Sequence, residues 1–357
     1  MRKSNERLPV TVRCPVRIDF AGGPTDVELF YTHDRGAVTS AAIQSWANVR
    51  VSQATEHNVE LISHDLGCAE HIPLDRYPEM ELEGPLKLLR AAVRKTPDIT
   101  SLKVETSVDV PAGSGLGGSA SLAVALLLAI DLFIHQEDNT DSLTTYSDTQ
   151  LRSVAQDAVR LENVDLGNTG GFQDQYTAAL GGFVAFEATA LGIEAIALEL
   201  SPDVIKHIES HSLLVYTGMS HISGDVHKQI WKEYEAGHPA TTAALHDVRD
   251  TAQEIAHCLT QGEVDHFPTL IAHAYDCQKQ LHPAVVPHDI QASISAYIDA
   301  GAQAGKLLGA GRGGTLYLYC PPEHQPKVQQ LVTRYGYESR PVHFAHKGAL
   351  YEFSSLN

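Results

Sequence analysis

The sequence predicts a soluble chain of mixed α and β structure, divided into two domains. With 357 residues the chain is long for one domain, because domains usually hold about 100–200 residues. Hydrophobic residues make up 43% and charged residues 20%, the proportions of an ordinary globular protein. Strand-like and helix-like patterns both occur along the chain, and glycine-rich passages separate some of them.

Strand patterns dominate the first hundred residues. The segment "LPVTVRCPVRIDFAGG", residues 8–23, alternates well enough to predict a strand that ends in a Gly-Gly-Pro turn. Residues 36–43 and 46–54 predict two further strands, and residues 101–110 predict another. Residues 119–134 then form an apolar run without a polar face, which indicates a helix buried in the core.

The second half of the chain combines helices with a few strands. Residues 149–163 carry apolar residues at helical spacing and precede a second glycine-rich passage, "DLGNTGGFQDQYTAALGG". We expect a domain boundary near residue 190, which gives an N-terminal domain of residues 1–190 and a C-terminal domain of residues 191–357. Beyond "FVAFEA", the strands expected are 213–218 and 315–320, and the helices expected are 241–260, 266–280 and 289–304.

The composition excludes several classes of partner and location. A net charge of −18 argues against nucleic acid and against an anionic membrane as partners, although backbone amides bind phosphate whatever the net charge. The five cysteines are scattered and form no C-x-x-C pair, which fits free thiols in a reducing compartment. The polar N-terminus has no apolar signal core, and the longest apolar run, residues 122–134, is too short to span a membrane. We therefore expect a cytoplasmic protein.

The stretch "VDVPAGSGLGGSAS", residues 108–121, contains a G-x-G-x-x-G pattern. A dinucleotide-binding fingerprint should follow the first strand of a βαβ unit and have an acidic residue about 20 positions later. Here more than a hundred residues precede the pattern, and Asp131 lies within the apolar helix. A Walker A loop needs a lysine where this chain has Ser119. Both interpretations are therefore weak.

A third interpretation keeps the physical chemistry without a named motif. A Gly/Ser loop at the start of a long helix offers free backbone amides at the positive end of the helix dipole, which suits a polyphosphate. The hydroxyls of Ser114, Ser119 and Ser121 add donors or a magnesium ligand. The alternative is a tight turn with capping serines.

The glycine stretch resembles the central phosphate-binding motif of the GHMP kinases. Two further pieces agree in order, "CPVRIDFAGGPTDVELF" near the N-terminus and "GKLLGAGRGGTLYLYC" near the C-terminus. "RIDFAGGPTD", "GLGGS" and "DLGNTGGFQDQY" are most similar to the D-glycero-D-manno-heptose 7-phosphate kinases. The resemblance implies an α+β fold, with an N-terminal domain like the second domain of ribosomal protein S5 and a ferredoxin-like C-terminal domain. It also implies an active site in the cleft between them.

The resemblance further implies an ATP- and Mg²⁺-dependent sugar kinase that phosphorylates the anomeric (C1) hydroxyl. Asp174 is then the base and Arg17 the catalytic cation, while Ser119 and Glu162 hold the metal ion. From the residues alone, Asp174 is as well explained by a turn cap, and Glu162 by a solvated surface group. The phosphate loop comprises Pro111, Gly113, Ser114, Gly115, Leu116, Gly117, Gly118, Ser119 and Ala120. Substrate contacts are expected at Asp26, Thr25, Gly23, Gly170, Gly171, Gln173, Gly311 and Arg312, although Thr25 equally suits a turn and Arg312 equally suits solvent.

The acceptor stays open between two kinds of sugar. A heptose 7-phosphate needs cations for its own phosphate, and the candidates are Arg312, Lys306 and Arg35. An unphosphorylated sugar such as fucose, galactose or a uronic acid is the alternative. Arg312 also departs from the family pattern, which commonly has a small residue there, and Leu308 replaces a frequent Ser or Thr.

Two hypotheses from other functional classes remain. The chain is expected to be a monomer or a homodimer. A non-catalytic sugar or nucleotide sensor on the same fold need not keep all of Arg17, Ser119, Glu162 and Asp174. A nicotinamide-dependent oxidoreductase would require that the glycine loop be a dinucleotide fingerprint after all.

Overall fold

The computed structural model describes residues 7–96, 99, 101–136, 146–218, 224–309, 311 and 313–354. A mixed sheet forms the N-terminal half of the molecule. Within these residues the sheet has eight strands in the order β12-β1-β2-β5-β3-β4, with β6 paired to β2 and β7 paired to β6. Only the β3–β5 pair is parallel among these described strands. The strands are β1 (Val10–Ala21), β2 (Gly36–Ser52), β3 (Asn58–Ser63), β4 (Cys68–Pro73), β5 (Leu102–Val108), β6 (Phe183–Thr189), β7 (Gly192–Ala197) and β12 (Leu350–Phe353).

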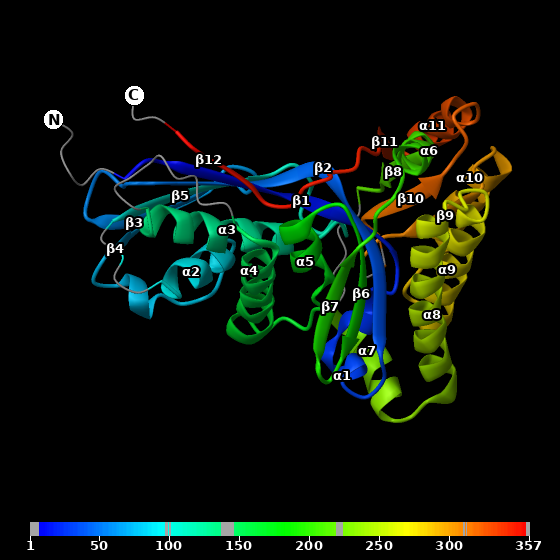
Figure 1. Cartoon of the computed structure of the whole chain (residues 1–357), viewed down its shortest axis with the longest axis horizontal. Helices are drawn as coiled ribbons and strands as arrows, with labels where there is room; N and C mark the ends of the chain where they lie inside the picture. Colours follow the sequence, from blue (N-terminus) through cyan, green and yellow to red (C-terminus); the bar gives the residue numbers. More distant parts are fainter. Residues whose placement is uncertain are drawn as a thin grey trace.

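Helices cover one face of this sheet (Figure 1). The central one, α3, has apolar residues on every side and is largely buried against the sheet, as its sequence predicts. The helices are α2 (Lys87–Arg94), α3 (Gly118–Ile134), α4 (Asp148–Arg160) and α5 (Gln173–Leu180); the short turns are η1 (Gly23–Asp26), α1 (Glu28–Tyr31), η2 (Tyr77–Glu79) and the π-helical η3 (Leu161–Asp165).

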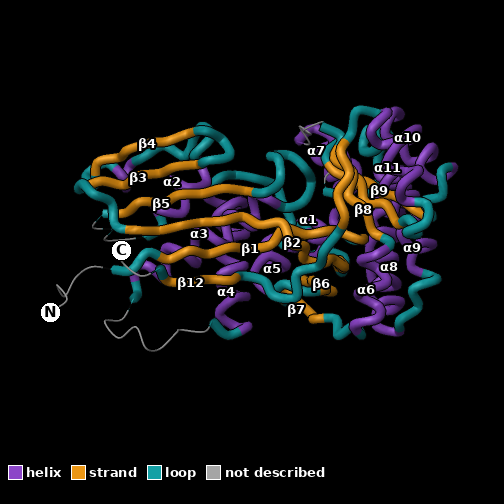
Figure 2. The backbone as a smooth tube through the Cα atoms, turned by 90° about the horizontal axis from the view of Figure 1, so that it is seen from above, coloured by secondary structure: helices purple, strands orange, loops and turns teal. Residues whose placement is uncertain are grey.

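A smaller antiparallel sheet and its helices form the other end of the molecule (Figure 2). Its order in the described chain is β11-β8-β10-β9. Its strands are β8 (Ser212–Tyr216), β9 (Ala304–Leu307), β10 (Thr315–Tyr319) and β11 (Glu338–Pro341). Its helices are α6 (Pro202–Ser210), α7 (Gly224–Glu235), α8 (Pro239–Gln261), α9 (Phe267–Leu281), α10 (His288–Asp299) and α11 (Gln325–Arg334). The α+β class is confirmed.

Strand β1 joins the two halves. Its alternation places Val16, Ile18 and Phe20 in a hydrophobic cluster that both halves share. The ring of Phe20 lies 5.4 Å from that of Phe267 and 5.6 Å from that of Tyr317, measured between centroids. The intervening polar residues of the same strand therefore lie at the junction, where a site between the halves would form.

Two predicted elements differ in the structure. The runs 36–43 and 46–54 belong to one strand, β2, because β1 pairs with both parts across an irregularity at Pro15 and Val16. The helix expected over 289–304 ends at Asp299, because the chain turns there to begin β9 at Ala304.

The division near residue 190 stays a proposal. Strand β7 runs to Ala197 and belongs to the larger sheet, and β12 returns from the C-terminus to pair with β1. The larger sheet is therefore built from segments on both sides of the expected boundary.

Candidate active site

Two glycine loops meet at the junction of the halves. A Cβ atom on Gly115, in the loop before α3, would lie 2.6 Å from the carbonyl oxygen of Leu308. A Cβ atom on Gly309 would lie 2.8 Å from the Cα of Gly115. Side chains are excluded at these two positions because the backbones of the two loops touch each other. Part of the glycine excess thus serves the packing of loop against loop, a role that the sequence did not suggest.

The start of α3 is open to an anion. No side chain in the described part of the chain caps this N-terminus, so its first amides retain the binding capacity of a helix end. The loop residues differ in exposure: Pro111 and Gly113 are exposed, whereas Ser114, Leu116 and Ala120 are buried. The hydroxyl of Ser121 donates to the carbonyl of Pro15 at 2.8 Å, so its role is internal and the phosphate contact considered for it is not supported.

Arg17 and Asp174 form a two-pronged ion pair beside this loop. Nε of Arg17 donates to Oδ1 of Asp174 at 2.6 Å, and Nη2 donates to Oδ2 at 3.0 Å. Nη1 donates to the carbonyl of Gly115 at 2.6 Å. Burial lowers the pKa of Arg17, but the carboxylates of Asp174 and Asp19 outweigh it and leave that pKa raised.

Asp174 lies in the first turn of α5 and faces the phosphate loop. A Cβ atom on Gly117 would be 3.0 Å from its Oδ2, so the carboxylate touches the loop backbone. Its side chain remains 26% exposed, whereas the Arg17 side chain is 5% exposed. No side-chain cap bond is formed at the start of α5 within the described chain, which disfavours the turn-cap alternative.

Glu162 is buried and fully hydrogen-bonded, unlike a solvated surface glutamate. Its Oε1 accepts from the Ser119 hydroxyl at 2.7 Å, and its Oε2 accepts from Nε2 of Gln175 at 2.7 Å. It lies in the π-helical turn η3, a distortion that often occurs at functional sites. Burial raises the pKa of Glu162, against the two hydrogen bonds that lower it.

This hydroxyl and carboxylate suit a magnesium ion. Mg²⁺ prefers oxygen ligands and is usually held by one or two carboxylates together with substrate phosphates. Ser119 and Glu162 are already in contact at the N-terminus of α3, where a phosphate would bind. Gln175, which donates to Glu162, was not among the residues predicted from the sequence, although it directly follows Asp174 on α5.

Asp26 lies near Asp174 and is buried. Its Oδ2 accepts a hydrogen bond from the backbone N–H of Gln173 at 3.1 Å. Gly171 is required here, because a Cβ atom at that position would overlap the Asp26 carboxylate at 1.8–1.9 Å. Burial raises the pKa of Asp26 to about 8; the carboxylates of Asp174 and Asp19 add to this, against the Gln173 N–H and the charge of Arg17.

Other residues expected to contact substrate have structural partners. The buried hydroxyl of Thr25 lies 2.8 Å from the carbonyl of Gly22 and 2.9 Å from that of Ala37, so its contacts support the turn role and not the substrate role. Gly170 exchanges two hydrogen bonds with the side chain of Asn163. A Cβ atom on Gly311 would lie 2.6 Å from the carbonyl oxygen of Val285. Arg312 lies outside the described residues.

Two of the cations considered for a sugar phosphate are engaged elsewhere. Lys306 is wholly buried, and its Nζ donates to the carbonyl of Asp19 at 2.6 Å. Burial lowers the pKa of Lys306, against the attraction of Asp19. Arg35 has a side chain 68% exposed and pairs with Glu187 at 2.8 Å. Neither supports the phosphate-binding role.

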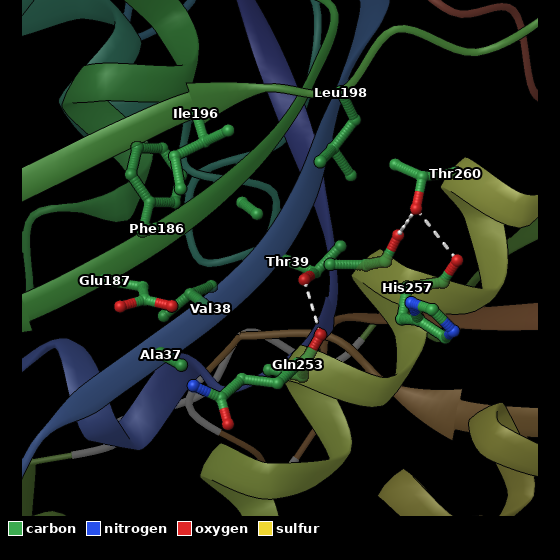
Figure 3. A pocket seen from close by; sticks show the side chains of 13 residues that line it. Ala37, Val38, Thr39, Phe186, Glu187, Ile196, Leu198, Gln253, His257 and Thr260 are labelled. Atoms are coloured by element: carbon green, nitrogen blue, oxygen red, sulfur yellow. Dashed lines mark hydrogen bonds between the residues drawn. The ribbon is translucent and has the colours of Figure 1, made fainter.

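A pocket of about 240 Å³ lies elsewhere, between β2, β6, β7 and α8 (Figure 3). Its walls are mainly apolar, and Thr39 at its base donates to the carbonyl of Ala252 at 2.7 Å. None of the residues predicted to bind nucleotide, metal or sugar contributes to it. No helix among the described residues is both long and apolar enough to cross a membrane.

Comparison with known proteins agrees with this arrangement. Residues 85–182 match the family described as GHMP kinases N terminal domain. The D-glycero-alpha-D-manno-heptose 7-phosphate kinase of Campylobacter jejuni is 24% identical over 335 residues, which cover 92% of this chain and 94% of that protein. The bifunctional fucokinase/GDP-fucose pyrophosphorylase of Arabidopsis thaliana is 25% identical over 341 residues, which cover 91% of this chain and 31% of that protein.

Solved structures share the fold across nearly the whole chain. A D-glycero-D-manno-heptose 1-phosphate kinase from Bacteroides thetaiotaomicron has a TM-score of 0.77 at 22% identity, covering 97% of this chain and all of that one. A Lactococcus lactis galactokinase complexed with galactose has a TM-score of 0.74 at 15% identity, covering 96% and 95%. The chain therefore has the GHMP kinase fold and carries a GHMP kinase N-terminal domain.

Proposed function

We propose that this GHMP kinase transfers the γ-phosphoryl group of ATP to the anomeric hydroxyl of a sugar. The observation that carries the proposal is that two pairs meet at one glycine loop: Arg17 with Asp174, and Ser119 with Glu162. Phosphoryl transfer needs a phosphate cradle, a metal ion, a positive charge and an oriented hydroxyl. The loop, the two pairs and the acceptor side around Asp26 correspond to these four needs.

In the proposed reaction, the sugar oxygen forms a bond to the γ-phosphorus while the bond to the β-phosphate oxygen breaks and releases ADP. The hydroxyl proton passes to a carboxylate oxygen of Asp174. Arg17 holds that carboxylate in a fixed orientation through its two hydrogen bonds. The loose transition state of phosphoryl transfer requires mainly positioning and electrostatic stabilisation.

Ser119 and Glu162 would hold Mg²⁺, which neutralises charge on the β- and γ-phosphate oxygens when bound. Gln175 orients the Glu162 carboxylate from the side opposite Ser119. Because Gln175 and Asp174 are consecutive residues of α5, the helix fixes the metal ligand and the base relative to each other.

The first acceptor to test is D-glycero-D-manno-heptose 7-phosphate, since the Campylobacter jejuni relative with that name covers nearly the whole chain. An unphosphorylated sugar such as fucose or galactose is the second candidate. Lys306 and Arg35 are engaged elsewhere, so a 7-phosphate would depend on another cation such as Arg312, which lies outside the described residues.

A panel of sugars and sugar 7-phosphates with ATP and Mg²⁺ tests the proposal. ADP release measures turnover, and ³¹P NMR of the product shows whether the new ester is at C1. We expect one acceptor to stand out with an anomeric phosphate as product. ADP release with none of the sugars, together with thermal stabilisation by ATP or sugar, would support the sensor alternative. Stabilisation by NAD alone would overturn the kinase proposal.

A further inference from the structure

Asp19 is a buried carboxylate next to the site with no part in the reaction above. It follows Arg17 by two positions on β1 and is 3% exposed. Among the described residues, none donates a hydrogen bond to its Oδ1. An unpaired buried polar atom destabilises the fold, and more so if it is charged.

A lysine from the other half of the molecule closes the space behind Asp19. Nζ of Lys306 on β9 lies 3.9 Å from Oδ1 of Asp19 and donates to its backbone carbonyl. Between Asp19, Lys306 and Gln278 is a cavity of about 10 Å³, room for about one water molecule. Oε1 of Gln278 also lacks a donor within the described chain. The cation behind the carboxylate offsets part of the cost of burying its negative charge.

The backbone of Gly23 lies close to both Asp19 and Gln173. A Cβ atom there would lie 2.6 Å from Oδ2 of Asp19 and 3.1 Å from Nε2 of Gln173. Gln173 is itself buried, and none of the described residues donates to its Oε1. Its backbone N–H donates to Asp26, so the carboxylate of Asp19 and the amide of Gln173 lie beside Gly23, and Gln173 also contacts Asp26.

We propose that Asp19 and Gln173 form a subsite for a hydroxyl group of the acceptor, remote from the hydroxyl that is phosphorylated. The inference rests on the proposed sugar kinase function. A hydroxyl in this subsite donates to Oδ2 of Asp19 and accepts from Nε2 of Gln173, a pairing that the donors and acceptors of a sugar alcohol satisfy.

The charges specify a neutral hydroxyl. A phosphate or carboxylate would be repelled by Asp19 and by the nearby Asp174, and Lys306 is shielded behind Asp19. If the acceptor carries its own phosphate, that group therefore lies away from this subsite. In this subsite Asp19 selects sugars by the configuration of one hydroxyl group, and Lys306 is the positioning residue that holds the Asp19 carboxylate.

The test uses the full chain and the best acceptor from the panel. Asp19→Asn keeps the shape but removes the charge, and we expect the KM for the sugar to rise at least about tenfold, the worth of one charged hydrogen bond. The KM for ATP is expected to stay within about threefold. Gly23→Ala places a methyl group against Oδ2 of Asp19 and is expected to raise the sugar KM in the same way. Asp157→Asn, at an exposed carboxylate of α4, is the matched control.

Deoxy analogues of the acceptor separate binding from structure. One monodeoxy sugar should bind the wild-type protein more weakly than the parent sugar does. The Asp19→Asn variant should bind that deoxy sugar and the parent sugar equally well, because the hydroxyl that is removed is the partner of the charge that is removed. If Asp19→Asn fails to fold with Lys306 unpaired, the double variant Asp19→Asn/Lys306→Met restores a neutral pair, and Gly23→Ala still reports on the subsite.

The outcomes also separate this inference from the proposed function. If sugars are phosphorylated but neither Asp19→Asn nor Gly23→Ala changes the sugar KM, the subsite is wrong and the kinase function stands. Equal increases in the KM values for ATP and sugar would make Asp19 structural and would overturn the subsite as well. A wild-type protein that phosphorylates no sugar overturns both.

Discussion

The carboxylates on the two sides of the site are held in different ways. Both oxygens of Asp174 accept from Arg17, and both oxygens of Glu162 accept from Ser119 and Gln175. On the acceptor side, Oδ1 of Asp19 and Oε1 of Gln173 have no donor within the described chain. The protein itself therefore pairs the polar atoms of Asp174 and Glu162, whereas at Asp19 and Gln173 it leaves buried polar atoms without a donor.

The largest effect is expected at the base, and it tests whether the transfer side performs chemistry. Asp174→Asn keeps the side-chain shape but removes the proton acceptor and the counter-charge of Arg17. We expect kcat to fall about 10²- to 10⁴-fold, the usual contribution of a positioned base. The KM for ATP should change little. A variant that turns over at a near-normal rate would show that Asp174 is not the base.

A smaller effect is expected at Gln175, which donates a hydrogen bond to Glu162, the proposed metal ligand. Gln175→Leu removes the donor to Oε2 of Glu162. Loss of such an orienting partner typically costs about 10–100-fold in metal affinity. We expect the Mg²⁺ concentration for half-maximal activity to rise by that factor, with the sugar KM unchanged. Calorimetric titration of Mg²⁺ into the ATP complex provides a readout besides activity.

An unaltered Mg²⁺ titration in Gln175→Leu would mean that Ser119 alone fixes Glu162. A rise in the sugar KM of Gln175→Leu would show that the two sides are not independent, because a change at the metal side would then also alter sugar binding.

The pH dependence of stability tests the acceptor side. The pKa of Asp26 is about 8 in the folded chain against an ordinary value of 3.8, so the folded protein keeps a proton that the unfolded chain has released. Between these values, unfolding releases that proton, and the free energy of unfolding falls as pH rises. From pH 6 to pH 8 this contribution is about 2 kcal/mol, since each unit is worth about 1.4 kcal/mol.

Urea unfolding at pH 6 and pH 8 measures this contribution. Asp26→Asn cannot lose the proton, so it should lack this part of the decrease that the wild-type protein shows. If the free energy of unfolding decreases equally in both proteins, other groups cause the pH dependence, and burial does not keep the Asp26 carboxyl neutral.

The smallest effect is expected at Arg35. Its side chain is exposed and paired with Glu187, and such surface pairs contribute about 0–1 kcal/mol. Arg35→Ala should change neither the melting temperature appreciably nor the KM for a sugar 7-phosphate. A selective rise in that KM, with the KM of an unphosphorylated sugar unchanged, would place Arg35 at the acceptor's phosphate and revise the assignment of the acceptor side.

Sequence patterns predicted the elements that carry the site better than the contacts within it. The apolar helix after the glycine loop forms where expected, because its residues leave no polar face to expose. Gln175 and Asp19 were missed because their contacts depend on how the chain folds back: Gln175 contacts Glu162, 13 residues away in another element, and Asp19 contacts Lys306, 287 residues away. For Thr25 the sequence left a turn role and a substrate role open, because a turn and a binding loop use the same residue types, and its contacts favour the turn.

By itself, the sequence determined that the chain mixes strands with helices, that one long helix is buried, and that a glycine loop lies at its start. These follow from local periodicity and from the chemistry of single side chains, which do not depend on distant partners. The α+β class and the candidate residues for phosphoryl transfer came instead from the resemblance to the GHMP kinases. Only the tertiary structure decided that two glycine loops touch, that Arg17 engages both oxygens of Asp174, and that Asp19 lies between a buried lysine and the backbone of Gly23. Hydrogen bonds and desolvation depend on distances of a few ångströms between residues that folding brings together, and no local pattern specifies those distances.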